Sequence, residues 1–228
     1  GSRSGEVVLK LFSGYQGALQ TDGYERYELL DGRKGVMLLA CWAHARRKFS
    51  DSIKNDKERA ESALDQIQLL YEVERQIKDQ SLSFEDAAKL RERLAYPIMV
   101  RFEKWLVAEH AKVIKGSPIE KAILYTYNRF NKLSRYHLDG RYNIDNNGIE
   151  NAARPVAVGR KNYLFCQNDD TAESTAIIYS LMGCCKAAEV DFRKWLIYFL
   201  DHVHDYDENY DKDIADLLPD NLRKAGIL

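Results

Sequence analysis

The sequence has few cysteines, few prolines and no long hydrophobic run. Its 228 residues include four Cys and four Pro. The cysteines have neither the number nor the spacing of a secreted disulfide framework, so we expect a reducing, cytoplasmic location. A zinc site is disfavoured too, because Cys184 and Cys185 are adjacent and chelate one ion poorly. No apolar run approaches the roughly 20 residues that cross a bilayer, so we expect no membrane association.

The chain also lacks a net charge of either sign. Lys and Arg total 34 and Asp and Glu total 35, a balance that does not by itself indicate a nucleic-acid-binding protein. The charge is unevenly distributed, however. Residues 43–48 (AHARRK) and 154–161 (RPVAVGRK) are basic without an acid, whereas residues 201–220 carry eight acids and one Lys. Because a DNA backbone responds to local charge, the two basic segments are candidates for phosphate contacts.

Two short segments predict β-strands. Residues 18–21 (ALQT) end directly before Asp22, and residues 36–42 (VMLLACW) form a continuous apolar run, typical of a strand buried on both faces. Residues 6–12 fit either a helix or a short strand, and residues 24–30 predict one or two helical turns. With 45% hydrophobic residues, the chain has enough apolar side chains for a buried core.

Long helices are predicted from residue 57 to about residue 115, where apolar side chains recur at helical spacing. The helix expected over 83–113 begins with SFED, close to a capping box, and Pro97 is expected to kink it or break it in two. The segment SPIE, with Ser117 as N-cap, is the strongest local helix start in the chain.

The C-terminal third predicts a short helix near 147–153, a turn around Gly159, a helix over 171–188 and a helix over 191–203 capped by Asp191. The expected fold class is therefore α/β and helix-dominated, with two short strands that we expect to be parallel.

Two acidic residues stand where functional carboxylates occur. Asp22 follows a predicted strand, and ligands of open α/β sheets bind outside the carboxyl ends of the strands. The alternative is that Asp22-Gly23 is only a turn, since Asp-Gly is a strong turn dipeptide. Glu150 lies on the short predicted helix, in a stretch (142–150) that holds three Asn and two acids. The alternative here is a helix cap, with Asn147 in a capping box or with Asn146 or Asp145 as the cap instead.

Together, the two carboxylates suit chemistry at a phosphodiester. Carboxylate oxygens hold Mg²⁺ (or Mn²⁺), which bridges them to phosphate. Two such ions about 3.5–4 Å apart stabilise the attacking and leaving oxygens. Arg154, Arg160 and Lys161 are then placed to hold the DNA backbone, and His44, near a strand end, is suited to a phosphate contact.

Several ordered motifs resemble one known family. They are LQTDGYERY (19–27), CWAHARRKF (41–49), IDNNGIENAARPVAVGRKNYLF (144–165) and TAESTAIIYSLMGCCKAAEVDFRKWL (171–196). From about Gly14 to Leu218, the chain resembles the catalytic core of the DDE transposases of the insertion-sequence-sixty-six family, which belong to bacterial mobile elements.

The resemblance implies a partial ribonuclease-H-like fold, with about two short strands left and a large all-helical insertion. It implies that Asp22 is the second catalytic acid and Glu150 the third, both ligands of Mg²⁺. The implied reaction is cleavage of DNA at the element's ends, followed by attack of the freed 3′-hydroxyl on target DNA. The expected DNA contacts are His44, Arg46, Arg47, Arg154, Arg160, Lys161 and Asn162. The expected parts are a first core part (6–54), the insertion (55–134), a second core part (135–205) and an acidic tail (206–228).

The chain departs from the family pattern at two places. Asn151 follows the Glu where the family usually has Arg. The first Asp of the triad is expected upstream of Asp22, where Glu6 is the only acid. We therefore expect weak metal binding, no transposition by this chain alone, and self-association along an open sheet edge into a homo-oligomer.

Two other functions remain open, and none of the three readings involves a small-molecule substrate. One is a non-catalytic DNA- or protein-binding module that keeps the transposase scaffold. The other is a stand-alone nuclease without preference for element ends. The absent first Asp favours the binding module for this chain taken by itself.

Overall fold

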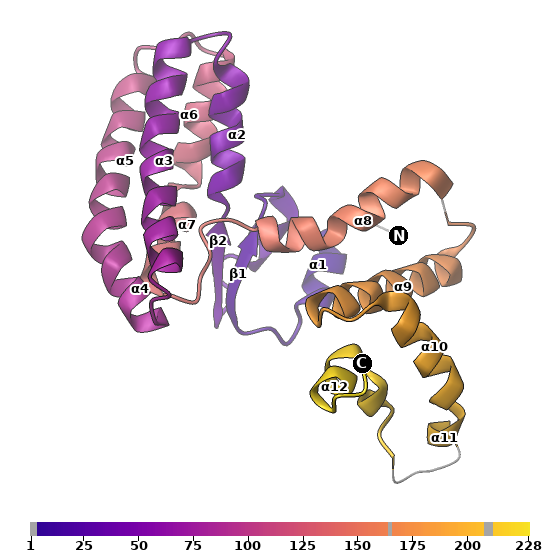
Figure 1. Cartoon of the computed structure of the whole chain (residues 1–228). Coiled ribbons are helices and arrows are strands. Elements are labelled where there is room, and N and C mark those ends of the chain that lie inside the picture. The colour runs from indigo at the N-terminus through magenta and orange to yellow at the C-terminus, as the bar shows by residue number, and fades with distance from the viewer. Residues whose placement is uncertain (1–3, 164–165, 208–211) are drawn as a thin grey trace. The chain divides into compact units, whose positions relative to one another are not determined.

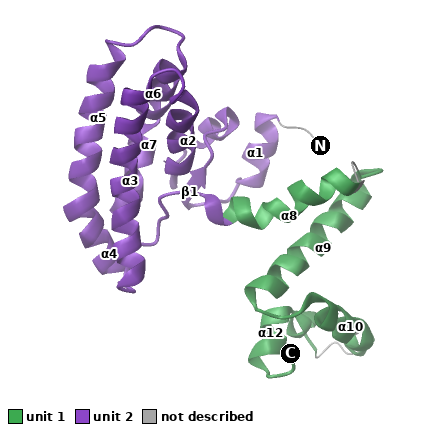
Figure 2. Ribbon diagram, turned by 45° about the horizontal axis from the view of Figure 1, so that its top comes forward, with its two compact units in different colours: residues 1, 149–228 green, residues 2–148 purple. Residues whose placement is uncertain are grey.

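The computed structural model describes residues 4–163, 166–207 and 212–228. The chain forms two compact units (Figure 2), the N-terminal unit (residues 2–148, purple) and the C-terminal unit (residues 149–228, green). Each unit has a hydrophobic core of its own. No helix in the described ranges is long and apolar enough to cross a membrane.

A small α/β part opens the N-terminal unit. Strands β1 and β2 pair in parallel, with Gly17 opposite Val36 and Thr21 opposite Ala40. The two predicted strands and their direction are thus confirmed. Successive residues Leu38 to Ala40 are all buried, so both faces of β2 are covered, as predicted. The ambiguous segment at 6–12 is a helix. The elements are α1 (Gly5–Leu11), β1 (Gly17–Thr21), the 3₁₀ helix η1 (Glu25–Leu30), β2 (Val36–Ala40) and α2 (Trp42–Ser52).

A block of helices follows in the same unit. In Figure 1, α2, α3, α5 and α6 run side by side, and α2 packs against both α3 and α6. The predicted caps are confirmed: the Ser83 hydroxyl accepts a hydrogen bond from the Asp86 amide, and the Ser117 hydroxyl accepts one from the Glu120 amide. The elements are α3 (Lys57–Asp79), α4 (Phe84–Leu90), η2 (Arg91–Ala95), α5 (Tyr96–His110), α6 (Pro118–Asn128), α7 (Phe130–Ser134) and η3 (Arg135–Leu138).

The interruption predicted at Pro97 takes the form of a π-helical segment, η2, between α4 and α5. Pro97 has no N–H to donate, and widening the preceding turn keeps the chain helical. Arg91, at the start of η2, is only 3% exposed and donates two hydrogen bonds to the carboxylate of Glu74, at 2.9 and 2.6 Å. It also donates to the backbone carbonyls of Tyr136 and Asp139, so it fastens η2 to α3, to η3 and to the residue after η3.

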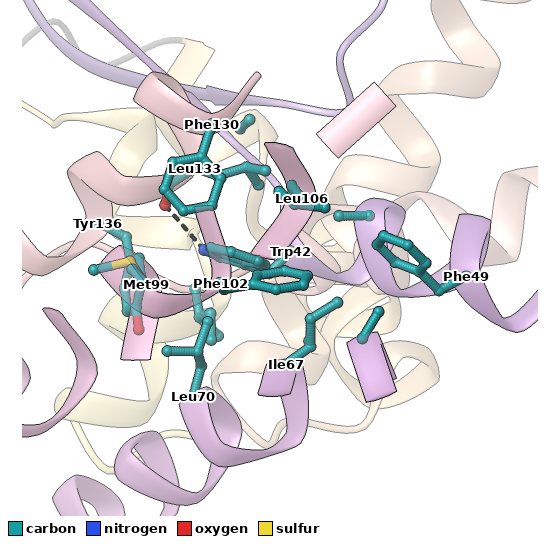
Figure 3. Packing of buried hydrophobic residues seen from close by; sticks show 14 of the residues in the cluster. Trp42, Phe49, Ile67, Leu70, Met99, Phe102, Leu106, Phe130, Leu133 and Tyr136 are labelled. Carbon is teal, nitrogen blue, oxygen red and sulfur yellow. Dashed lines mark hydrogen bonds between the residues drawn. The ribbon is translucent and has the colours of Figure 1, made fainter. Parts of the chain in front are cut away.

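The main core of the N-terminal unit surrounds Trp42, the first residue of α2 (Figure 3). Its ring packs against Phe102 and Phe130, and its indole N–H donates a 2.9 Å hydrogen bond to the carbonyl of Leu133. Because α2 begins directly after β2, this core also fixes the place where the sheet ends.

The C-terminal unit is helical throughout its described residues. Its small core includes Trp195, whose indole N–H donates to the carbonyl of Leu217. The Asp191 cap is confirmed, since its carboxylate accepts from the Lys194 amide. The elements are α8 (Asn147–Tyr163), which starts at the end of the N-terminal unit, α9 (Asp169–Ala187), α10 (Phe192–His202), α11 (His204–Asp207), η4 (Ile214–Leu217) and α12 (Pro219–Lys224).

The predictions of a short helix near 147–153 and of a turn around Gly159 were wrong. Helix α8 runs through both positions for 17 residues, with Pro155 inside it. A helical Gly is unfavourable by about 1 kcal/mol relative to Ala, which weakens a helix without ending it. A Pro removes one intrahelical hydrogen bond, and the carbonyl left over on exposed Asn151 can bond to water.

Candidate active site

The candidate site is built on the carboxyl ends of β1 and β2. Thr21 and Ala40 are paired as the last residues of the two strands. Asp22 follows the first strand, and Cys41 and the N-terminus of α2 follow the second. Asp22 therefore stands at the edge of the parallel sheet where ligands bind in α/β proteins, as the sequence predicts.

The Asp22 side chain takes part in a local turn. Its Oδ1 accepts a 2.9 Å hydrogen bond from the amide of Tyr24, the bond of an Asx-turn. Among the described residues, its Oδ2 has no hydrogen-bond partner. The side chain also lines a cavity of about 420 Å³, together with apolar residues of α1 and Tyr27 of η1. The turn predicted as the alternative role thus occupies one carboxylate oxygen and leaves the other available.

Residues at the end of α6 hold the backbone of this turn. The hydroxyl of Tyr125 donates to the carbonyl of Asp22, and the guanidinium of Arg129 donates to the carbonyl of Gly23, each at 3.2 Å. Arg129 also stacks on the Tyr125 ring, with 4.2 Å between the guanidinium carbon and the ring centroid. Burial raises the pKa of Tyr125, which keeps its hydroxyl protonated as a donor. The helical block therefore positions the Asp22 backbone.

Gly23 gives a direct test of this support. Its φ of +83° is the left-handed region, and an added Cβ would lie 2.8 Å from Nε of Arg129. Gly23→Ala is expected to lose roughly 1–2 kcal/mol of unfolding free energy for the backbone conformation, and more for displacing Arg129. Gly116→Ala is the matched control, because Gly116 has φ +82° and nothing within 4 Å of its added Cβ. Urea unfolding of both variants checks this, and equal losses would contradict it.

The segment leading into α8 is fastened to the same edge of the sheet. The side-chain amide of Gln20 donates to the carbonyl of Asn143 at 2.8 Å. The backbone amide of Trp42 donates to the carbonyl of Ile144 at 3.1 Å. Residues 143–147 therefore pass the carboxyl ends of β1 and β2, although more than 100 residues separate them from Gln20 and Trp42 in the chain.

Asp145 anchors the start of α8. Its Oδ2 accepts a 2.9 Å hydrogen bond from the hydroxyl of Tyr71 on α3, and its Oδ1 accepts from the backbone amide of Asn147. Burial, followed by the negative charge of Asp145, raises the pKa of Tyr71, so its hydroxyl stays a proton donor. Asp145 thus serves the beginning of α8, a role that the sequence had left open between Asp145, Asn146 and Asn147.

Glu150 lies in the first turn of α8. It belongs to the C-terminal unit and Asp22 belongs to the N-terminal unit, so the convergence of their carboxylates stays a prediction. Arg154 and Lys161, four and eleven residues after Glu150, share its face of the helix. Arg160 and Asn162 lie on other faces, and all four of these predicted DNA contacts are exposed. The basic segment is therefore part of one helix rather than a turn.

The Mg²⁺ ion that the resemblance implies can be tested against the residues present. Carboxylate oxygens are the ligands that Mg²⁺ prefers, and Asp22 and Glu150 supply them. Within residues 4–163, 166–207 and 212–228, however, no three His, Cys, Asp or Glu side chains form a group that could hold a metal ion. The donor chemistry of Asp22 and Glu150 fits the ion, and because the two residues belong to different units, a metal position shared between them stays a prediction.

The first basic segment lies on α2. Arg46 and Arg47 are exposed, and His44 is half-buried in the first turn. Arg46 and Arg47 line a cavity that also includes residues of α3, Arg75 among them.

Sequence reasoning missed Tyr71, Arg75, Tyr125 and Arg129. All four lie in the helical block, outside any motif, and only their contacts identify them.

Comparisons with known proteins agree with the motifs. The family model described as "Transposase IS66 family" matches residues 1–174. The uncharacterized protein y4hP of Sinorhizobium fredii is 31% identical over 241 residues, which cover 98% of this chain and 43% of that protein. The uncharacterized protein y4jD of the same organism is 31% identical over 211 residues, which cover 89% of this chain and 40% of that protein. The chain thus spans about two fifths of the length of these relatives. No solved structure matches it significantly.

Proposed function

The chain belongs to the IS66 transposase family, and we propose that it is part of a DDE transposase catalytic domain with a ribonuclease-H-like core. In the longer protein, this domain would cleave DNA at the ends of a mobile element and transfer the freed strands to target DNA. The core would consist of residues 6–54 and 135–205, interrupted by the helical insertion 55–134 and followed by the acidic tail 206–228.

One observation carries this proposal. The segment 143–147, which leads into the helix with Glu150, is hydrogen-bonded at the strand ends where Asp22 stands. A bare helix cap needs no such anchoring to a distant sheet. A catalytic carboxylate does, because metal ligands from distant parts of a chain have to be brought to one place.

Each site residue has a proposed role. Asp22 and Glu150 would be ligands of Mg²⁺, which when bound stabilises the attacking and leaving oxygens of a phosphodiester. His44 and Asn162 would hydrogen-bond to the DNA backbone. Arg46, Arg47, Arg154, Arg160 and Lys161 would pair with its phosphates. Glu6, the only acid before Asp22, lies on α1 rather than on a strand, so a third ligand would come from the additional length seen in the relatives.

The test compares the longer protein with the 228-residue chain on labelled duplex DNA that carries an element end. The longer protein is expected to cleave and to join strands only with Mg²⁺ or Mn²⁺. The 228-residue chain, which is expected to bind these ions weakly, should leave the DNA intact. Failure of the longer protein to cleave DNA that it binds would overturn the proposal.

A second function is a non-catalytic DNA- or protein-binding module. The exposed arginines of α2 and α8 favour it, because they can hold DNA phosphates without a metal ion. Such a module would bind its partner equally well with Mg²⁺ and with a chelator, and Glu150→Gln would change nothing. The cleavage test therefore separates the two functions.

We also propose that the chain forms homo-oligomers. Within the part of the chain that the structure describes, the sheet has two strands and its edges are unpaired. Helix α9 exposes apolar side chains, with Ile177 53% and Ile178 44% exposed. Sedimentation velocity at increasing concentration is expected to show a faster-sedimenting species. A single monomeric species up to about 100 μM would contradict this. A dissociation constant above about 100 μM corresponds to an association free energy of less than roughly 5.5 kcal/mol.

A further inference from the structure

A polar cavity of about 490 Å³ lies against α2 and α3 of the N-terminal unit. Most of its lining comes from one face of each helix. Residues 43, 46, 47 and 50 of α2 follow the i, i+3, i+4, i+7 pattern, and residues 68, 71 and 75 of α3 share a face in the same way. The lining residues are Ala43, Arg46, Arg47, Ser50, Gln68, Tyr71, Arg75 and Asn147.

Among the described residues, the lining includes three Arg and no acid. Within the described part of the chain, Arg46, Arg47 and Arg75 form no ion pair, whereas Arg59 and Arg91 of the same helical block pair with carboxylates. The carboxylate of Asp145, outside the lining, accepts hydrogen bonds from two lining residues, Tyr71 and Asn147. Like charges gathered in the lining of one cavity repel one another, and a bound anion would relieve that repulsion.

The neutral part of the lining suits a phosphate. Ser50, Gln68 and Asn147 carry hydroxyl and amide donors, and the planar Arg fork matches two phosphate oxygens at once. In the described part of the chain, no apolar wall of the kind that would hold a nucleotide base lines the cavity. Its aromatic lining residue there is Tyr71, which already donates to Asp145. Asn147 places the cavity beside the segment that is anchored at the strand ends.

We propose that this cavity binds a phosphate group of the DNA backbone. The phosphate would be held by Arg46 and Arg47 of α2 together with Gln68 and Arg75 of α3, in the helical insertion. This inference rests on the proposed function, because it assumes that DNA is the substrate. It gives the insertion a direct role: α3 contacts DNA in addition to holding the start of α8 through Tyr71. Nothing in the local sequence of Arg75 indicates this, since Arg75 lies among acids in YEVERQIKD.

The test measures binding of the 228-residue chain to a labelled DNA duplex by fluorescence anisotropy between 50 and 200 mM salt. Each phosphate contact adds about 0.9 to the slope of log K against log salt. Arg75→Gln is expected to lower the slope by that amount, so that the wild type loses roughly 3.5-fold more affinity than the variant over this fourfold salt range. Arg46→Gln should act in the same way.

Arg101→Gln is the matched control. Arg101 lies exposed on α5 without an ion pair among the described residues, so the change in charge is the same at a site outside the cavity. Its slope should equal that of the wild type. Equal slopes for Arg75→Gln and Arg101→Gln would overturn the inference and leave the proposed function standing. Circular dichroism of all variants confirms that they are folded.

Two other outcomes also decide the matter. If the chain binds inorganic phosphate with submillimolar affinity but no DNA, the cavity is a small-anion site and the inference fails. If the chain binds no DNA even at 50 mM salt, the inference fails too. The proposed function is then judged separately, by DNA cleavage with the longer protein.

Discussion

In the longer transposase that we propose, the Glu150→Gln variant is expected to lower Mg²⁺-dependent DNA cleavage roughly a thousandfold. A bound metal ion contributes several kcal/mol of charge stabilisation in phosphoryl transfer. Each 1.36 kcal/mol corresponds to a factor of ten in rate. The amide of Gln keeps the size of the side chain but removes the negative charge that holds the ion. Single-turnover cleavage of a labelled element end measures the effect, and Asp22→Asn should behave in the same way.

The controls are identical changes at exposed acids of α3. Glu58→Gln and Asp65→Asn remove one charge each from side chains without a hydrogen-bond partner in the described part of the chain. Both are expected to leave the cleavage rate unchanged. If Glu150→Gln cleaves as well as Glu58→Gln does, Glu150 is no metal ligand and its position at the start of α8 is only structural.

Trp42→Ala is expected to destabilise the N-terminal unit by about 4–6 kcal/mol. Replacing a buried Trp by Ala lowers the unfolding free energy by roughly 3–5 kcal/mol, because the surrounding side chains fill the resulting cavity only in part. Trp42 is fully buried against Phe102 and Phe130, and its loss also leaves the buried carbonyl of Leu133 without its donor. This is a large share of the total stability of 5–15 kcal/mol that is typical of a domain. Urea unfolding followed by far-ultraviolet circular dichroism measures it.

Trp42→Phe separates the two contributions. It keeps an aromatic ring in the core but removes the N–H that Leu133 accepts, so we expect a loss of about 1–3 kcal/mol. Trp195→Ala reports on the other unit, because Trp195 belongs to the separate core of the C-terminal unit. A small effect of Trp42→Ala would show that the helical block does not depend on the junction between β2 and α2.

Local sequence patterns predicted the strands and helix caps, because these depend on residues close together in the chain. The β2 strand follows from seven consecutive apolar residues, and the caps at Ser117 and Asp191 follow from side chains that bond to amides three residues away. The position of Asp22 at the carboxyl edge also follows, because a strand that ends at Thr21 leaves the next residue there. Family membership was recognisable from the ordered motifs.

Contacts between distant segments were not predictable in the same way. The bond from Tyr71 to Asp145 spans 74 residues, and the bond from Arg129 to Gly23 spans 106. No local pattern selects these partners, because each depends on how the helical block packs on the sheet. The continuous α8 was missed for a related reason: Pro155 and Gly159 are read locally as helix breakers, yet a 17-residue helix tolerates both.

The distance between the Asp22 and Glu150 carboxylates, in a crystal of the chain soaked with Mn²⁺, tests the central claim most directly. The account predicts a separation of roughly 4–6 Å, within reach of a shared metal position. Anomalous density from Mn²⁺ should then lie between them. Carboxylates far apart, with Glu150 hydrogen-bonded back onto the start of its own helix, would contradict the catalytic assignment and favour the binding module.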